Sequence, residues 1–475
     1  MKFKNILIVL LLGILCFGCI SAINAVSDED INNNVLQNQA DVNSVSIDDN
    51  NEVVSVSQDE TVLTETNNNV KVGATSDTSS SLTPYQKFCR DLEENSGTIY
   101  LTGNIKVKEP FLIKHKTVID GNGYTIDGQQ KTTIFKSTSS LTLKNIILKN
   151  GKSNDRGGAI HSNGDLTLDN CQFINNQAKN FGGAIAMIKG HLTITNSKFE
   201  KNSVQNSGSS GYGGALWIFS STSKITKTIF KSNTCLSKSL KSHSKATKYK
   251  FNGGAIFYNK GSSHTLTDCK FIGNKASNHG GVMFVAKSPL KINKCTFTSN
   301  KACYEDGGAI SFSGKKLTIT NSNFKKNLAY EDGGAIDSYT FNGKKIYITI
   351  KNTVFDSNTG YKCGGAIWMG LKTVYNVANS KFIKNKASSA GAVEAEDGSS
   401  KFTKCTFTSN KAAKVTSWTV KTKAGGNLAH SGGAILIKNK CTVLKSVFKN
   451  NKATWGKSVK VEGGKLISKG NKGIK

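Results

Sequence analysis

The sequence has few prolines and arginines, no cysteine pair of the kind that binds zinc, and no long apolar run after its N-terminal region. Among its 475 residues are only 3 prolines and two arginines, Arg90 and Arg156, and the nine cysteines after residue 25 include no Cys-x-x-Cys pair. Without that pair or a His-rich spacing we expect no metal and no cofactor. After the N-terminal region no segment reaches the ~18 consecutive apolar residues that cross a bilayer, so we expect no transmembrane span after signal removal.

The composition is rich in glycine, lysine, asparagine and serine. Aromatic residues make up 8% and glycine occurs 46 times, a mixture that suits a turn-rich β protein better than a helical bundle. The formal net charge is +31. Residues 26–80 carry eleven acidic residues and one lysine, so the remainder of the chain is even more basic. Such a field predicts acidic partners, such as cell-wall polymers, acidic glycans or, in vitro, nucleic acid.

The first 25 residues are typical of a secretory signal peptide. Two lysines precede the apolar run Ile6–Ile20, and small residues follow it. We predict cleavage after Ala25, with Ala22 as an alternative position. Cys19 leaves a lipoprotein site as a further alternative. The sequence thus predicts a secreted protein that is extracellular or attached to the cell surface.

Two segments separate the signal peptide from the body. Residues 26–81 are acidic, rich in Asn, Asp, Ser and Val, and without a sustained period, which predicts a disordered linker. Residues 82–97 are expected to form a capping helix with Thr83 as N-cap and Pro84 at the first helical position. The apolar face of this helix would close the open end of the body, and it consists of Tyr85, Phe88, Cys89 and Leu92.

The body, residues 98–475, is a repeat of about 26 residues. A Phe-x-x-Asn tetrad occurs ten times, with Phe at positions 173, 199, 230, 271, 297, 324, 355, 382, 407 and 448. A Gly-Gly-Ala-Ile block or a close variant follows each of the first nine tetrads, and a further copy at Gly157 precedes them. Five residues before each Phe the residue is apolar, and two residues before it stands Cys, Ser or Thr.

Short alternating segments that recur at this period predict an all-β, parallel β-helix of about twelve coils. Each coil would have three sides, and each strand would pair with its copies about 4.8 Å above and below. We expect a right-handed solenoid because parallel crossovers overwhelmingly are right-handed. Phe and Ile would fill the interior. The repeated Asn would adopt left-handed backbone at a corner and bond its stacked neighbours, and the Gly pair would allow a tight bend.

The paired motifs resemble the repeat of chlamydial polymorphic outer-membrane proteins. They are also similar to adhesin-like surface proteins of methanogenic archaea, which belong to the pectate-lyase-like β-helix (pectin lyase-like) superfamily. The segment from Val118 to Gly128, VIDGNGYTIDG, resembles the opening coils of such β-helices. The resemblance covers roughly 98–465 and implies a solenoid at the cell surface. We expect neither a translocating barrel nor an immunoglobulin-like module from the residues after Phe448, so the resemblance does not specify an anchor.

Most cysteines occupy interior columns of the repeat. Cys269 and Cys295 stack in neighbouring coils, but in-register parallel strands are a poor geometry for a disulfide. We therefore expect thiols that act as small hydrophobic residues. The six cysteines assigned to interior columns are Cys171, Cys235, Cys269, Cys295, Cys405 and Cys441.

The residue directly after each Gly-Gly-Ala-Ile block is predicted to point outward. In three successive coils this residue is Trp217, Phe257 and Phe284, and Trp368 occupies the same column further along. An exposed aromatic ladder on a flat sheet would suit sugar rings. The alternative is that the connections fold over these side chains and bury them.

Three connections between the Asn and the Gly-Gly are long, and all leave the same corner: Ser203–Tyr212, Thr234–Asn252 and Lys411–Ser431. Binding variability tends to collect on such an edge. We expect the lysines of the middle insertion to hold the acidic groups of a glycan whose rings stack on the aromatic ladder. These lysines are Lys238, Lys241, Lys245 and Lys248. The alternative is a solvated loop without a ligand.

Two carboxylates in the outward column offer a weaker, enzymatic hypothesis. Asp337 and Glu394 lie two coils apart, near 9.6 Å by strand spacing, with Trp368 between them. Inverting glycosidases hold their carboxyl groups about 6.5–9.5 Å apart. A lyase of this fold would need clustered acids for calcium. The acidic pairs Glu305-Asp306 and Glu331-Asp332 precede Gly-Gly and are interpreted as turn residues instead.

The signal, the linker, the long repeat and the insertions on one edge together predict a cell-surface adhesin or structural surface protein without catalysis. Its partners would be glycans or acidic wall polymers, on a host or a neighbouring cell. A polysaccharide lyase or glycoside hydrolase is the alternative. Nucleic acid fits the charge but not the export.

Overall fold

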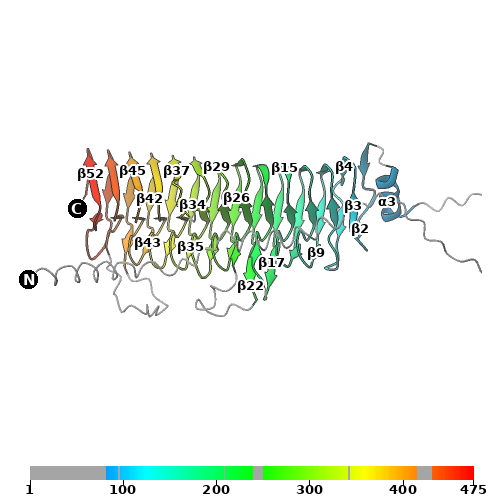
Figure 1. Cartoon of the computed structure of the whole chain (residues 1–475), viewed down its shortest axis with the longest axis horizontal. Coiled ribbons are helices and arrows are strands. Elements are labelled where there is room, and N and C mark those ends of the chain that lie inside the picture. The colour runs from blue at the N-terminus through cyan, green and yellow to red at the C-terminus, as the bar shows by residue number, and fades with distance from the viewer. Residues whose placement is uncertain are drawn as a thin grey trace, which may run out of the picture. The chain divides into compact units, whose positions relative to one another are not determined.

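A computed structural model describes residues 82–94, 97–207, 209–238, 250–340, 343–413 and 431–474. The predicted signal peptide, 1–25, and the predicted linker, 26–81, lie outside the described residues. The body is a parallel β-solenoid with one short helix near its N-terminal end (Figure 1). The prediction of an all-β parallel helix of about twelve coils is confirmed. Its right-handed sense stays a prediction.

The helix α3 (Pro84–Glu94) covers the first coil, as predicted (Figure 1). Phe88 is buried, and its ring lies edge-on to Phe111 with the centroids 4.8 Å apart. Tyr85 and Leu92 pack partly buried against the same core. The helix therefore shields apolar side chains that would otherwise face solvent at the end of the solenoid.

Sheet A contains 14 strands and carries the apolar column five residues before each Phe. All its neighbouring strands are parallel, so each strand adds one coil. In chain order they are β1 (Thr98–Tyr100), β4 (Thr117–Asp120), β7 (Leu141–Lys144), β11 (Leu166–Asp169), β15 (Gly190–Thr195), β20 (Ser221–Thr226), β25 (His264–Thr267), β29 (Leu290–Asn293), β33 (Lys316–Thr320), β37 (Ile346–Lys351), β41 (Thr373–Ala378), β45 (Ser399–Thr403), β49 (Lys440–Leu444) and β52 (Lys465–Lys469).

Sheet B has 13 strands, and ten of them hold the Phe of the tetrad at their centre. These strands are β2 (Ile105–Lys106), β5 (Thr125–Asp127), β8 (Ile147–Lys149), β12 (Gln172–Ile174), β16 (Lys198–Glu200), β21 (Ile229–Lys231), β26 (Lys270–Ile272), β30 (Thr296–Thr298), β34 (Asn323–Lys325), β38 (Val354–Asp356), β42 (Lys381–Ile383), β46 (Thr406–Thr408) and β50 (Val447–Lys449).

Sheet C also has 13 strands, and most of them begin at the Ile of Gly-Gly-Ala-Ile or at the apolar residue that replaces it. They are β3 (Phe111–Ile113), β6 (Phe135–Ser137), β10 (Ile160–Ser162), β14 (Ile185–Met187), β19 (Leu216–Phe219), β24 (Ile256–Asn259), β28 (Met283–Ala286), β32 (Ile310–Ser313), β36 (Ile336–Ser338), β40 (Ile367–Met369), β44 (Val393–Ala395), β48 (Ile435–Ile437) and β51 (Val459–Val461).

A fourth ladder, sheet D, was not predicted. Its ten strands lie in the connections that precede the Gly-Gly pairs and their variant, so ten coils have a short fourth side. The strands are β9 (Lys152–Ser153), β13 (Gln177–Ala178), β17 (Ser203–Asn206), β22 (Thr234–Ser237), β27 (Lys275–Ala276), β31 (Lys301–Ala302), β35 (Leu328–Ala329), β39 (Thr359–Gly360), β43 (Lys386–Ala387) and β47 (Lys411–Ala412).

The first two long insertions extend this fourth side. The strands β17 and β22 are longer than their neighbours and pair over Ser203–Asn206 with Thr234–Ser237. A two-stranded sheet E forms beside them from β18 (Gly211–Tyr212) and β23 (Phe251–Asn252). Figure 1 shows β17 and β22 projecting from one edge of the solenoid. The described parts of the first two insertions thus share one corner, as predicted, whereas residues 414–430 of the third insertion lie outside the described residues.

Ladders of identical residues fill the interior. The ten Phe side chains of the tetrad are buried, and neighbouring rings stack with centroids 4.4–5.1 Å apart. Offset stacking of this kind adds to the free energy gained from burial, which is about 1.5–3 kcal/mol for each Phe. All nine cysteines of the described residues are free thiols, as expected, and seven of them are buried.

The repeated Asn forms a second ladder, and one detail of its prediction is wrong. Each Asn of the tetrads except the last, Asn451, donates from its Nδ2 to the Oδ1 of the Asn in the next coil, for example Asn274 to Asn300 at 3.0 Å. The backbone at the Asn is not left-handed. The residue before it is, with φ of 56° at Ser299 and 55° at Lys326. The left-handed conformation therefore lies at the exposed residue before the Asn. The Asn itself keeps a conformation in which its side-chain amide points along the solenoid axis.

The first glycine of each Gly-Gly pair makes the bend into sheet C. Gly280 has φ of 67°, and a Cβ atom there would lie 2.1 Å from the carbonyl oxygen of Met283. A larger residue would have to change the path of the chain. The prediction that this pair permits a tight bend is confirmed.

Candidate functional site

The residues that follow Gly-Gly-Ala-Ile form one column along sheet C, and we call it the post-isoleucine column. Strand pairing places each member opposite the next, as in Trp217 with Phe257 and Phe257 with Phe284. Their side chains do not belong to the continuous interior core. The column therefore lies on the outer face of sheet C, as the alternation predicts.

The prediction that this column is exposed is wrong. Trp217 and Phe257 are each 1% exposed, Phe284 is 0% exposed and Trp368 is 7% exposed. These rings cannot stack on a sugar in this conformation. The alternative stated from the sequence, burial beneath the connections, describes the structure.

The residue directly before each Gly-Gly pair provides part of the cover, and we call this set the pre-glycine column. Its backbone stacks from coil to coil because the first glycine donates to the pre-glycine carbonyl of the next coil, as Gly253 does to His279 at 2.9 Å. Its side chains lie against the post-isoleucine column. The ring of Phe181 is 4.8 Å from that of Trp217, and the ring of Tyr212 is 4.7 Å from that of Phe257.

The predicted lysine cluster is only partly described. Lys238 is exposed at the end of β22. Lys241, Lys245 and Lys248 lie outside the described residues. At the far end of the insertion, the Nζ of Lys250 lies 3.4 Å from Glu305. The composite site of aromatic rings and lysines therefore lacks exposed rings at Trp217, Phe257 and Phe284.

Asp337 and Glu394 lie in one column two coils apart, with Trp368 between them, as predicted. Both side chains are 0% exposed, which the sequence did not indicate. Glu394 pairs with Lys438 at 2.8 Å. A glycan has no access to either carboxyl group in this conformation, so the expected glycosidase arrangement lacks a solvent-facing pair.

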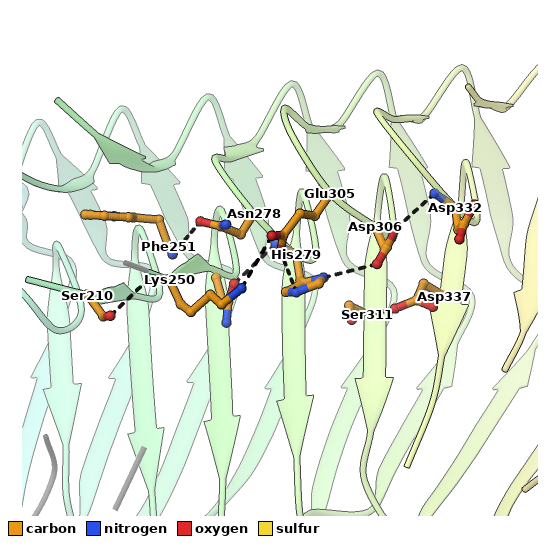
Figure 2. Close-up of polar contacts among 11 residues, drawn as sticks. Ser210, Lys250, Phe251, Asn278, His279, Glu305, Asp306, Ser311, Asp332 and Asp337 are labelled. Carbon is orange, nitrogen blue, oxygen red and sulfur yellow. Dashed lines mark hydrogen bonds and ion pairs between the residues drawn. The ribbon is translucent and has the colours of Figure 1, made fainter. Parts of the chain in front are cut away.

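A histidine that the sequence reasoning missed is the centre of a polar cluster beneath the connections (Figure 2). The Nε2 of His279 lies 2.6 Å from the Oε2 of Glu305, and its Nδ1 lies 3.5 Å from the Oδ2 of Asp306. His279 and Asp306 belong to the pre-glycine column of successive coils, and Glu305 precedes Asp306. The imidazole is thus held at its Nε2 by the carboxylate of Glu305.

Asp337 completes this cluster from the post-isoleucine column (Figure 2). Its Oδ2 accepts a hydrogen bond from the hydroxyl of Ser311 at 2.9 Å, whereas its buried Oδ1 has no hydrogen-bond partner. One ligand atom from each of His279, Asp306 and Asp337 lies within 4.8 Å of the other two. The two columns therefore bring one nitrogen and two carboxylates together from three coils.

A second carboxylate group adjoins the first. Oxygen atoms of Asp306, Glu331 and Asp332 also lie within 4.8 Å of one another. The backbone N–H groups of Asp332 and Cys363 donate to Asp306 and Asp332, each at 2.9 Å. Lys362 lies 3.4 Å from Glu331 and supplies positive charge to this group. The acidic pairs are therefore members of a largely buried network, and their interpretation as simple turn residues is incomplete.

Burial and the close charges shift the pKa values of this network in opposite directions. Burial alone would lower the pKa of His279, but the carboxylates of Glu305 and Asp306 outweigh it and raise that pKa to about 10. Burial would raise the pKa of Glu305, but the charge of His279 and its hydrogen bond lower it to about 2. Burial and the charge of Asp306 raise the pKa of Asp337 well above its usual range. The cluster thus holds excess negative charge that protons must offset.

Known proteins resemble this chain in its repeat. Residues 170–186 and 294–313 match the family model of the Chlamydia polymorphic membrane protein repeat. Each matched segment contains one Phe-x-x-Asn tetrad and the Gly-Gly-Ala-Ile block after it. The match agrees with the resemblance stated from the sequence, and it suggests a cell-surface protein.

Two proteins of Dictyostelium discoideum also match. Metabotropic glutamate receptor-like protein P is 28% identical over 237 residues, which cover 40% of this chain and 16% of that protein. Metabotropic glutamate receptor-like protein R is 29% identical over 202 residues, 41% of this chain and 11% of that protein. The match spans less than a fifth of the length of either relative. In the part of this chain that the structure describes, no helix has the length and apolar character of a membrane span.

Proposed function

We propose that this protein is a secreted, surface-displayed adhesin or structural surface protein that binds acidic glycans or acidic wall polymers by charge, without catalysis. The single observation that carries the proposal is the charge of the last coils. Residues 401–475 contain 17 lysines and one acidic residue, Glu462. A concentration of one sign of charge attracts polymers of the opposite sign.

Several lysines of these coils lie exposed on sheets A and B and at the corner between them. Lys440 and Lys465 stand opposite each other on β49 and β52. Lys404 and Lys445 occupy the same left-handed corner of successive coils. We define the lysine patch as seven exposed residues, Lys401, Lys404, Lys440, Lys445, Lys449, Lys465 and Lys469.

Few acidic side chains neutralise the positive charge of the lysine patch. Among the described residues none of its seven members lies in an ion pair, whereas Lys198 and Lys231 near the other end both pair with Glu200, at 2.6 Å and 3.0 Å. Uncompensated ammonium groups remain available to carboxylate or sulfate groups of a polymer. Neighbouring coils repeat at about 4.8 Å, so the pairs Lys440–Lys465 and Lys404–Lys445 offer charges at this spacing to an extended chain.

Several features support display at the surface and binding over catalysis. The signal-like N-terminus supports export, and the match to a repeat of chlamydial membrane proteins supports a surface location. The adhesin role is the one that the resemblance to archaeal surface proteins implies. The burial of Asp337 and Glu394 favours a binding role over glycan hydrolysis.

Binding to a charged and an uncharged polysaccharide at rising salt tests the proposal. Immobilised polygalacturonate should retain the purified protein, dextran should not, and retention should fall steeply between 0.1 M and 1 M NaCl. Over that range the screening length falls from about 10 Å to about 3 Å. Retention on dextran, or binding to polygalacturonate that salt does not weaken, would contradict binding by charge.

A further inference from the structure

The cluster around His279 combines one histidine with two aspartates, and a further carboxylate, Glu305, contacts the histidine, as is typical of a metal site. We propose that His279, Asp306 and Asp337 bind one divalent first-row transition-metal ion, of the class of Zn²⁺ or Mn²⁺. This inference goes beyond the proposed function, because it concerns the covered seam and not the lysine patch. It rests on three independent features of the described residues.

The first feature is the orientation of His279. Its Nε2 contacts the carboxylate of Glu305 at 2.6 Å, which holds the proton on Nε2, so Nδ1 is the nitrogen at which a metal ion would take the place of a proton. Metal-binding histidines in proteins commonly donate their second nitrogen to a carboxylate in this way. At 3.5 Å from Asp306 Oδ2, the Nδ1 atom is too distant for a strong hydrogen bond, and it has no other partner.

The second feature is the unpartnered oxygen of Asp337. Asp337 is 0% exposed and its Oδ1 makes no hydrogen bond, although a buried carboxylate oxygen without a partner is costly. The Ser311 hydroxyl satisfies the other oxygen and fixes the side chain. A ligand atom of this residue lies within 4.8 Å of those of His279 and Asp306. A cation between these residues would satisfy the unpaired oxygen.

The third feature is charge. Within about one side-chain length the cluster contains the carboxylates of Glu305, Asp306 and Asp337, and Lys250 offsets only part of their charge through Glu305 at 3.4 Å. A divalent cation between the ligand atoms would offset the remaining negative charge.

The ligand set selects the class of ion. One imidazole nitrogen with two carboxylates suits zinc, manganese or iron, whereas calcium takes six to eight oxygen ligands. The adjoining carboxylates Glu331 and Asp332 are not included, because the Nζ of Lys362 lies 3.4 Å from Glu331 and the backbone N–H of Cys363 donates to Asp332. The proposal is therefore confined to the site that contains His279.

Calorimetric titration of the chelator-treated full chain tests the site. Zn²⁺ or Mn²⁺ should bind at one ion per chain and raise the unfolding temperature in a concentration-dependent manner. Co²⁺ as a spectroscopic probe should develop visible absorption from coordination. Ca²⁺ and Mg²⁺ at the same concentrations should not saturate a site. Absence of saturable binding by Zn²⁺ and Mn²⁺, or a preference for Ca²⁺, would overturn the proposal.

Matched variants locate the ion. Asp337→Asn keeps the shape of the side chain and should abolish binding and the Co²⁺ absorption, as should His279→Gln. Glu305→Gln should weaken binding by roughly 10–100-fold, as loss of an outer carboxylate does. The control is Glu394→Gln, a buried carboxylate of the same column two coils away, which should bind as the parent does. Binding that survives in a folded Asp337→Asn variant would place the ion elsewhere and contradict the assignment.

Discussion

The amide Nδ2 of Asn300 donates to the Oδ1 of Asn327 in the next coil at 2.9 Å, and the same oxygen accepts the backbone N–H of Asn300 at 3.1 Å. Each ladder Asn thus satisfies two donors of the coil before it. Both residues are buried, with exposures of 0% and 1%. The ladder is a chain of buried hydrogen bonds, and its disruption leaves unsatisfied polar groups on both sides.

We predict that Asn300→Ala destabilises the solenoid by about 1–3 kcal/mol, because it removes the acceptor of Asn274 and the donor to Asn327 in a buried position. Urea unfolding followed by circular dichroism measures the difference. The control is Asn323→Ala, an exposed position on β34, which should change the free energy of unfolding by less than about 0.5 kcal/mol. Equal effects at the two positions would show that the ladder contributes nothing specific.

The Phe ladder gives a larger predicted effect. Phe297 is 0% exposed, and its ring lies 4.8 Å from that of Phe271 and 4.4 Å from that of Phe324. Phe297→Ala should cost about 3–5 kcal/mol in the free energy of unfolding, since it leaves a cavity between two rings. Phe297→Leu should cost much less. A cost under about 1 kcal/mol for the alanine variant would mean that the column is not buried.

The Asn and Phe columns could be predicted from the sequence because they depend on the spacing of the repeat alone. A Phe and an Asn at a constant offset in ten copies require stacked coils, and hydrogen-bonding side chains explain the constant Asn. The left-handed residue before the Asn was not predictable in this way, because Ser, Lys, Asn and Gly all occur there. Those residue types tolerate the conformation at an exposed corner, so no single identity repeats.

The covered face could not be predicted from alternation. Alternation states which side of sheet C carries Trp217, but it does not state what packs on that side. Alignment of the residue before each Gly-Gly would have provided the missing signal, since Phe181, Tyr212, His279 and Asp306 change in parallel with the facing column. The rings of Phe181 and Tyr212 face those of Trp217 and Phe257, and Asp306 lies near Asp337 further along. The polar cluster was missed because its members come from three coils and form no local motif.

Chemical accessibility of tryptophan tests the cover directly. Trp217 is 1% exposed, whereas Trp455 is 59% exposed. Limited treatment of the native protein with N-bromosuccinimide, followed by peptide mass spectrometry, should show oxidation at Trp455 and protection at Trp217. Denatured protein serves as the control, in which both should react. Rapid oxidation of Trp217 in the native state would restore the exposed aromatic ladder as a binding surface.

Acid stability depends on a second buried histidine, on β25. His264 is 1% exposed, and burial lowers its pKa to about 3. In the unfolded chain His264 binds a proton near pH 6.5, whereas in the folded chain it does so only near pH 3. Protonation therefore favours the unfolded chain progressively as the pH falls from about 6.5 towards 3. With about 1.4 kcal/mol for each pKa unit, the full effect is on the order of 4–5 kcal/mol.

The variant His264→Leu should therefore flatten the loss of stability between pH 6.5 and 3. Leucine already occupies the paired position of the next coil, Leu290, so the substitution suits the column. His191→Leu, at an exposed position, is the control and should leave the slope unchanged. Urea unfolding at several pH values measures the slope, and an unaltered slope in His264→Leu would contradict the role of this histidine.

The central claim is that the exposed lysines of the last coils, and not the covered aromatic column, bind acidic polymers. The most direct test compares the affinity of the parent protein for polygalacturonate at 0.1 M NaCl with that of two variants. The variant Lys401→Gln, Lys440→Gln, Lys465→Gln removes three charges from sheet A, and Trp217→Phe alters the covered column while it preserves the packing. We predict that the triple variant binds at least about tenfold more weakly, since tenfold corresponds to only about 1.4 kcal/mol, and that Trp217→Phe binds as the parent does. Unchanged affinity in a folded triple variant, or a loss confined to Trp217→Phe, would contradict the account.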